Sequence, residues 1–129
     1  MVKPIVEPKS FDIRASVLQR AISKTIFATG NDELRPNMMG VLCELSADNI
    51  TFVATDAHKL VRYRNEEVKT EEFSSFILPK KPIAHLKNIL GNADTVHVEY
   101  SENTHHIRFA FGTFELYSSL KEGKYGLFR

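Results

Sequence analysis

The sequence predicts an α+β domain with a pseudo-two-fold repeat, in which two helices lie on one face of antiparallel sheets. Amphipathic helical patterns occur at residues 15–27 and 82–90, and each follows one short strand pattern and precedes three more. The two halves align at an offset of about 65 residues, so that Phe11 corresponds to Phe76. The chain has 129 residues, of which 43% are hydrophobic, enough for one domain with a core.

The first half begins with a strand pattern that leads into a helix. Residues 11–14 alternate between apolar and polar, and Ser16 is a candidate N-cap for the helix. Gly30 and the two residues after it predict the end of that helix. The residues expected on its buried face are Val17, Leu18, Ala21, Ile22, Thr25 and Ile26. Three strand patterns follow, at residues 38–45, 49–55 and from 59 onward.

The second half repeats this order. A short strand at residues 76–78 precedes a helix that has Pro82 in its first turn and Gly91 at its end. The buried positions of the first helix at Leu18, Ala21 and Thr25 correspond to Ile83, Leu86 and Leu90. Three strand patterns follow, at residues 95–100, 107–111 and 114–120.

The formal net charge is only +1, but the charges are distributed unevenly. Residues 13–31 and 73–93, which contain the two helices, hold six lysines and arginines and no acidic residue. Because the helices are expected side by side, they would form one basic face. That face is either an ordinary solvated surface or a surface for phosphate groups. We expect no exposed aromatic side chains on it, which favours a duplex backbone over stacked single-stranded bases.

A polar turn without glycine or proline, residues 55–58, joins two of the strand patterns. Asp56 can accept a hydrogen bond from the backbone two residues further on and so close the turn. Leu60 lies beside the polar His58 and Lys59 at the start of the next strand. Two interpretations of this turn and Leu60 are open. The stretch is either a hairpin corner with one core leucine, or the rim of a pocket for apolar side chains of another chain.

Asp56, His58, His105 and His106 are the candidates for metal binding or acid–base chemistry. His105 and His106 are adjacent, so in a strand they would point to opposite faces and could not readily share one metal ion. The sequence has no His-Glu-x-x-His motif, no paired cysteines and no glycine-rich phosphate loop. A small metal-dependent or acid–base enzyme that uses Asp56, His58 and His105 is therefore kept only as the alternative function. We expect no cofactor.

Residues 55–60, Thr-Asp-Ala-His-Lys-Leu, resemble the Thr-Asp-Gly-His-Arg-Leu motif of the bacterial sliding clamp, the DNA polymerase III beta subunit. Residues 35–42 resemble the family's strand after the first helix, and residues 76–81 resemble the entry to the second helix. Residues 120–125 resemble the segment that joins the middle domain to the third. The resemblance implies the DNA-clamp fold and a non-catalytic processivity factor for the replicative polymerase. It further implies a ring-forming homodimer of three-domain subunits.

The family's helices line a channel around duplex DNA, which agrees with the basic face. The residues that we expect to contact DNA, chosen by charge and helix face, are Arg20, Lys24, Lys80, Lys81 and Lys87. The resemblance adds Arg35, which lies in a segment similar to the family's inner loop near DNA. Contacts to phosphates would be independent of the DNA sequence.

The resemblance also implies half of a pocket for short peptide motifs of DNA polymerases, the clamp loader and repair proteins. The pocket residues, assigned by motif position, are Met38, Thr55, Ala57, His58, Lys59 and Leu60. Leu60 and Met38 would contact the partner's apolar anchors, and His58 and Lys59 would offer polar contacts at the rim. Ala57 replaces the family's glycine, and its methyl group is expected to reshape the pocket slightly.

We expect three segments: a lead-in at residues 1–9, the clamp middle domain at residues 10–125, and a truncated linker to a missing third domain at residues 126–129. Without that domain, we expect weak peptide binding and no encirclement of DNA by this chain alone. The single cysteine, Cys43, excludes a disulfide within the chain, and no apolar run reaches membrane-spanning length. We expect a cytoplasmic protein with no membrane partner.

Overall fold

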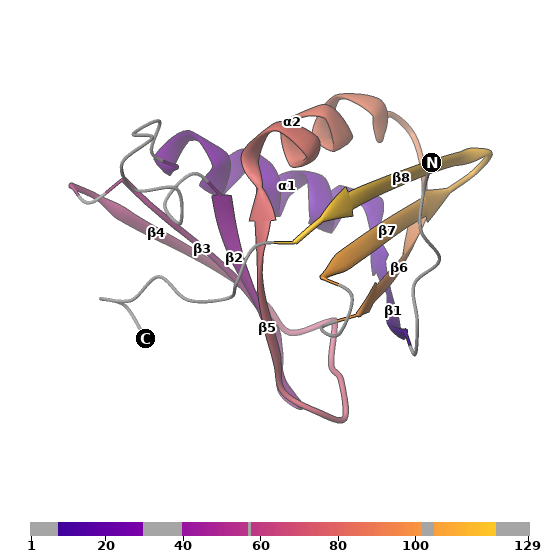
Figure 1. The fold of residues 1–129 in the computed structure, drawn as a ribbon, viewed down its shortest axis with the longest axis horizontal. Helices are drawn as coiled ribbons and strands as arrows, with labels where there is room; N and C mark the ends of the chain where they lie inside the picture. Colours follow the sequence, from indigo (N-terminus) through magenta and orange to yellow (C-terminus); the bar gives the residue numbers. More distant parts are fainter. Residues whose placement is uncertain (1–7, 30–39, 57, 102–104, 121–129) are drawn as a thin grey trace.

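The computed structural model describes residues 8–29, 40–56, 58–101 and 105–120, and these residues form eight strands, two α-helices and one 3₁₀ turn (Figure 1). In chain order the elements are β1 (Lys9–Arg14), α1 (Ala15–Thr25), η1 (Ile26–Ala28), β2 (Gly40–Leu45), β3 (Ile50–Thr55), β4 (Leu60–Asn65), β5 (Ser74–Pro79), α2 (Lys80–Ile89), β6 (Thr95–Ser101), β7 (His106–Phe111) and β8 (Phe114–Ser119).

The strands form two antiparallel four-stranded sheets, and each sheet contains strands from both halves of the chain. The strand orders are β1-β6-β7-β8 and β4-β3-β2-β5. β1 of the first half pairs with β6 of the second, and β5 of the second half pairs with β2 of the first. The predicted strand–helix–three-strand repeat is therefore confirmed, and the exchange of β1 and β5 joins the two halves into one unit.

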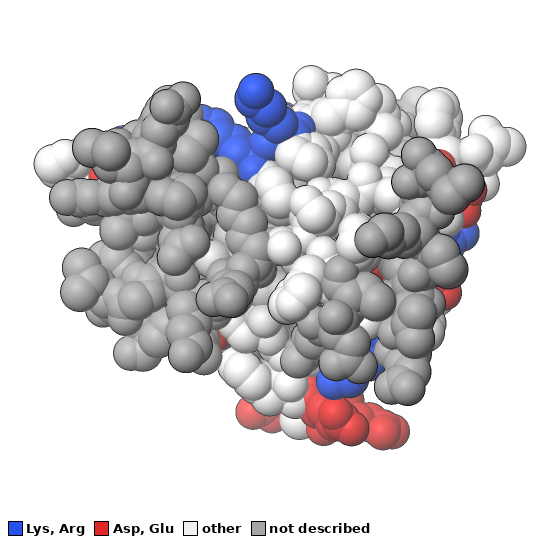
Figure 2. All heavy atoms as spheres, in the orientation of Figure 1, with Lys and Arg blue, Asp and Glu red and all other residues white. Residues whose placement is uncertain are grey.

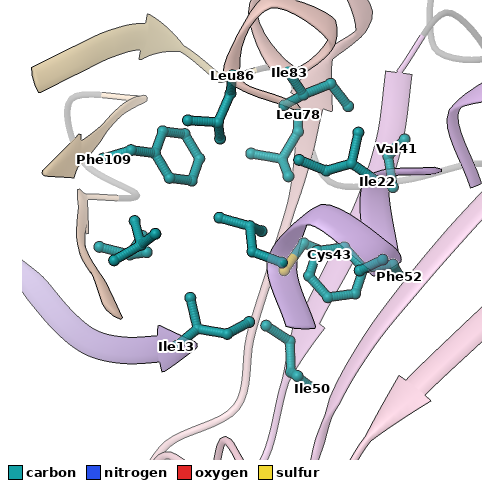
Figure 3. Close-up of a cluster of buried hydrophobic side chains, with 14 of the residues drawn as sticks. Ile13, Ile22, Val41, Cys43, Ile50, Phe52, Leu78, Ile83, Leu86 and Phe109 are labelled. Carbon is teal, nitrogen blue, oxygen red and sulfur yellow. The ribbon is translucent and has the colours of Figure 1, made fainter. Parts of the chain in front are cut away.

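The two helices lie side by side on one side of the molecule, and the sheets spread apart beneath them (Figure 1). Side chains from both sheets and both helices meet in one apolar core, which includes Ile13, Cys43, Phe52, Leu86 and Phe109 (Figure 3). The six repeat-related helix positions predicted to be buried are all buried, namely Leu18, Ala21, Thr25, Ile83, Leu86 and Leu90. Burial also raises the pKa of the Cys43 thiol, because a thiolate is poorly solvated there.

The expectation that Ser16 caps the first helix is wrong. α1 begins at Ala15, directly after β1, with the extended residue Arg14 at the N-cap position. The amide of Ala15 donates a hydrogen bond of 2.9 Å to the carbonyl oxygen of Asp94, in the segment just before β6. This contact from a distant part of the chain satisfies one of the donors that a helix start leaves free, so the helix starts earlier than the local sequence indicates.

The two helices end differently. α2 holds Pro82 in its first turn, as predicted, and it stops before Gly91, whose φ of +50° is the left-handed conformation that glycine adopts easily. α1 instead continues into η1. The stop signal predicted at residues 30–32 lies outside the described residues. None of the helices in the described ranges is long and apolar enough to cross a membrane.

Candidate functional site

The turn between β3 and β4 is closed by Asp56, as the sequence predicts. The Asp56 carboxylate accepts hydrogen bonds from the backbone amides of His58 and Lys59, both at 2.9 Å. Its second oxygen lies 3.0 Å from the ammonium nitrogen of Lys59. The Thr55 hydroxyl donates a 2.8 Å hydrogen bond to the carbonyl oxygen of Lys59. Four contacts therefore fix a turn that has no glycine or proline.

These hydrogen-bond donors also change the pKa of the Asp56 carboxyl. The amide of His58, together with the ammonium and amide groups of Lys59, holds the pKa of the Asp56 carboxyl well below its usual range. A carboxyl with a lowered pKa in the folded state stabilises that state at pH values above its unfolded pKa, about 3.9 for aspartate. The contribution is lost as the pH falls through the lowered, folded value.

We expect the side-chain carboxyl carbon signal of Asp56 to stay constant from neutral pH down to about 4, and both this signal and the backbone amide signals of His58 and Lys59 to show the carboxyl titration only below that value. An NMR pH titration measures this directly. In Asp56→Asn, the side chain no longer carries a titrating carboxyl, so the low-pH change at these two amides should disappear. A midpoint at or above the ordinary aspartate pKa in the native chain would show that the turn does not hold the carboxylate in the way described.

The side chains around the turn divide into a buried support and an exposed rim. Thr55 is buried, whereas His58, Lys59 and Leu60 are exposed. Leu60 is 39% exposed, so the interpretation of this position as a core leucine is wrong. An apolar side chain thus lies beside a basic one at a fixed turn. Met38 and Ala57, the other predicted pocket residues, lie outside the described residues.

The predicted DNA-binding residues lie on both helices. Arg20, Lys24 and Lys81 are exposed, and Lys80 and Lys87 are half-buried. Arg35 lies outside the described residues. Arg14 belongs to the same acid-free part of the sequence, but its guanidinium is 2.8 Å from the Glu67 carboxylate and so is already paired.

One polar contact that the sequence did not reveal joins the two helices. The side-chain amide of Gln19 in α1 donates a 3.1 Å hydrogen bond to the carbonyl oxygen of Lys87 in α2. This bond connects the two basic helices directly, and no local pattern could have indicated it.

The charges are segregated in space as well as in sequence. Blue lysine and arginine atoms lie at the edge of the molecule where Figure 1 places the helices, and red acidic atoms gather at the opposite tip, with a smaller blue group beside them (Figure 2). That tip is the β4–β5 connection, which contains Glu66, Glu67, Glu71 and Glu72. The expectation that no aromatic side chain is exposed near the basic helices is wrong, because Phe27 in η1 is 62% exposed.

The candidates for catalysis do not form a site. Asp56 and His58 lie at the β3–β4 turn of one sheet, while His105 and His106 lie at the start of β7 in the other. His105 is in a turn with φ of +55°, not in a strand, so its predicted strand orientation is also wrong. In the parts of the chain that the structure describes, no group of three or more His, Cys, Asp or Glu side chains could hold a metal ion.

A second titratable cluster, not predicted from the sequence, is an ordinary cross-strand ladder. His97 Nδ1 lies 2.7 Å from the Asp12 carboxylate on β1, and Arg108 on β7 contacts Glu99 at 2.9 Å and Glu115 at 2.6 Å. These side chains join all four strands of their sheet. Opposite charges on neighbouring strands stabilise pairing modestly, and the strand register that brings them together is not visible in the sequence.

Comparison with known proteins identifies the family of the chain. The family model for the DNA polymerase III beta subunit, central domain, matches residues 12–126. The chain belongs to this family. The recognition of a sliding-clamp middle domain from the residue 55–60 motif is therefore confirmed, and no finding supports the alternative of a small enzyme.

The relatives in this family are sliding clamps. The chain is 32% identical over 117 residues to the beta sliding clamp of Pseudomonas aeruginosa and 32% identical over 125 residues to that of Lactococcus lactis. These alignments include 90% and 96% of this chain but 32% and 33% of the relatives, so the chain spans about a third of the length of the curated relatives it matches.

Solved structures agree with the fold. A crystal structure of the DNA polymerase III beta subunit from P. aeruginosa matches 97% of this chain with a TM-score of 0.88 at 30% identity, over 34% of its own length. A P. aeruginosa sliding clamp bound to griselimycin matches 96% of this chain, and 33% of its own, with a TM-score of 0.83 at 30% identity. The predicted DNA-clamp fold is confirmed.

Proposed function

We propose that this chain is a domain of a non-catalytic processivity clamp, part of a ring that slides on duplex DNA and tethers the replicative DNA polymerase. The observation that carries the proposal is the separation of charge in a member of the sliding-clamp family. Two adjacent helices present Arg20, Lys24 and Lys81 to solvent and contain no acidic residue, while the β4–β5 connection on the opposite side is acidic.

Electrostatic contact of this kind suits sliding. Lysine and arginine side chains attract phosphates wherever they lie along the duplex, so the interaction energy changes little as the protein moves. The Gln19–Lys87 hydrogen bond connects the two helices directly, and their basic side chains face the phosphate backbone as one surface. Residues 10–125 would form the domain, and the full subunit would close as a homodimeric ring in the cytoplasm.

The second part of the proposal concerns the β3–β4 turn. We assign the rim formed by His58, Lys59 and Leu60 to binding the peptide motifs of DNA polymerases and the clamp loader. Leu60 supplies an exposed apolar contact, and the Lys59 side chain lies within a turn that Asp56 holds rigid. A fixed turn limits the conformational entropy that binding costs. Met38 and Ala57 complete this half of the pocket in the proposal.

The DNA-binding part is tested by the salt dependence of duplex binding. In the double variant Arg20→Ala/Lys81→Ala, one exposed cation is removed from each helix. We expect weaker binding and a slope of log K against log salt that is smaller by about 0.9 for each phosphate that is no longer neutralised, or about 1.8 if both side chains bind phosphates. Fluorescence anisotropy with labelled duplexes of two unrelated sequences measures both quantities.

The matched control is Arg62→Ala/Arg64→Ala, which removes the same charge from exposed positions on β4. We expect this control to leave the slope nearly unchanged. Equal losses of affinity in the two double variants would mean that DNA responds to the total charge of the chain, and the assignment of the helix face would be wrong.

A further inference from the structure

One exposed residue on the basic side of α2 is a histidine, and the DNA contacts assigned above do not include it. His85 is exposed one turn after the exposed Lys81 and one turn before the exposed Asn88, whereas Ile83 and Leu86 are buried. Residues spaced four and then three apart lie on one face of a helix. His85 therefore shares with Lys81 the side of α2 that faces away from the core.

The pseudo-two-fold repeat gives His85 a counterpart in α1. At the offset of about 65 residues, which pairs the buried Leu18 with the buried Ile83, His85 corresponds to Arg20. Arg20 is also exposed, and it is one of the cations assigned above to DNA. The two halves therefore place an arginine and a histidine at equivalent points of one surface. Two further exposed pairs correspond in the same way, Ser16 with Lys81 and Ser23 with Asn88.

The charged side chains of α2 and of its closest neighbours are all cations. α1 and β5 pack most closely against α2, and β5 contains no titratable side chain. Asp94, the nearest acidic residue along the chain, lies beyond the end of α2, and the Glu99 and Glu115 carboxylates of the other sheet are paired with Arg108. A proton on His85 therefore adds one more cation to helices that contain no carboxylate. The charged residues already present on the two helices are Arg20, Lys24, Lys80, Lys81 and Lys87.

We propose that His85 is a proton-dependent phosphate contact, so that this chain binds duplex DNA more tightly when the imidazole is protonated. Histidine is the side chain that ordinarily changes its charge between about pH 5 and 8, whereas arginine stays charged throughout that range. Nearby phosphates favour the charged imidazole, so binding of a duplex is coupled to the uptake of a proton at this position. Arg20 and His85 thus supply one constant and one pH-dependent cation at equivalent places.

This inference rests on the proposed function, because it requires a duplex to lie against the two helices. It adds a regulation of that contact by pH, which the lysine and arginine side chains of the same surface do not provide.

The test is fluorescence anisotropy of a labelled duplex with the native 129-residue chain and with His85→Gln, at about pH 5.5 and about pH 8. Glutamine keeps a polar side chain but cannot take up the proton. We expect nearly equal affinities at the higher pH and tighter binding by the native chain at the lower pH. At the lower pH, the slope of log K against log salt should be steeper by about 0.9 for the native chain than for the variant. The advantage of the native chain should therefore be roughly 3-fold smaller at about 200 mM salt than at about 50 mM.

Two further variants separate His85 from other titrating groups. His85→Arg carries its charge at both pH values, so its salt slope at the higher pH should be as steep as that of the native chain at the lower pH. His97→Gln is the matched control, because His97 lies on β6 of the other sheet, where its imidazole contacts Asp12. We expect His97→Gln to keep the pH dependence of the native chain.

The possible results distinguish a failure of this inference from a failure of the proposed function. If the native chain and His85→Gln bind the duplex with the same pH dependence, the role of His85 is wrong and the proposed function is unaffected. An equal loss of the pH dependence in His97→Gln would also overturn the role of His85. If the native chain binds no duplex at either pH, even at low salt, the proposed function is overturned and this inference with it.

Discussion

Replacing Gly40 with alanine is expected to destabilise the domain by about 1–3 kcal/mol, the usual cost of forcing extra volume into a packed core. Gly40 is the first residue of β2 and is paired with Pro79 of β5. A Cβ atom built at Gly40 would lie 2.5 Å from the carbonyl oxygen of Leu78 and 2.7 Å from a methyl carbon of Ile77. The oxygen belongs to the backbone of a neighbouring strand, so relief requires moving β5, which leads directly into α2.

Chemical denaturation of Gly40→Ala measures this destabilisation as a lower midpoint with an unchanged slope. The control is Ser119→Thr, which also adds one methyl group at a strand position but on the exposed surface of β8. We expect the control to change stability by less than about 0.5 kcal/mol. Equal stability of Gly40→Ala and the native chain would show that β2 and β5 are farther apart than described.

A larger destabilisation is expected from Leu86→Ala, about 2–5 kcal/mol. Leu86 is completely buried in α2, and its side chain points into the core that both sheets share (Figure 3). Truncation removes apolar contacts and leaves a cavity that the surrounding strands can fill only in part. Because α2 also presents Lys81, this variant should weaken DNA binding only at denaturant concentrations or temperatures where the domain begins to unfold.

Ile89→Ala is the comparison for Leu86→Ala, because Ile89 lies on the same helix but is half-buried. Its destabilisation should be clearly smaller, since part of its side chain already contacts solvent. Urea denaturation of both variants ranks the two positions. A larger effect at Ile89 than at Leu86 would contradict the orientation of α2 over the sheets.

The order of strands and helices could be predicted from the sequence because the periodicity that determines it is local. Alternating residues at 11–14 and helical spacing from Val17 to Thr25 are visible without any knowledge of tertiary contacts. The start of α1 could not be predicted in this way. Its first amide is satisfied by the carbonyl oxygen of Asp94, about eighty residues further along the chain, which no local cap motif reveals.

In the candidate site, too, local contacts could be predicted from the sequence and tertiary contacts could not. Asp56 closes its turn through amides two and three residues away, so the sequence was sufficient to predict that contact. The exposure of Leu60 and Phe27 depends on what packs against each position, and an apolar residue type by itself favours burial. For that reason the sequence alone could not decide whether Leu60 is a core residue or part of a pocket rim. It also could not indicate that Phe27 is exposed.

The measurement that tests the central claim most directly is NMR chemical-shift mapping of the labelled chain with a clamp-binding peptide from a DNA polymerase. The account predicts saturable changes centred on residues 55–60, largest near Lys59 and Leu60, and little change in β7 and β8. Absence of changes at residues 55–60 in folded protein at millimolar peptide, or changes centred on another surface, would contradict the assignment of this turn as the clamp's peptide-binding rim.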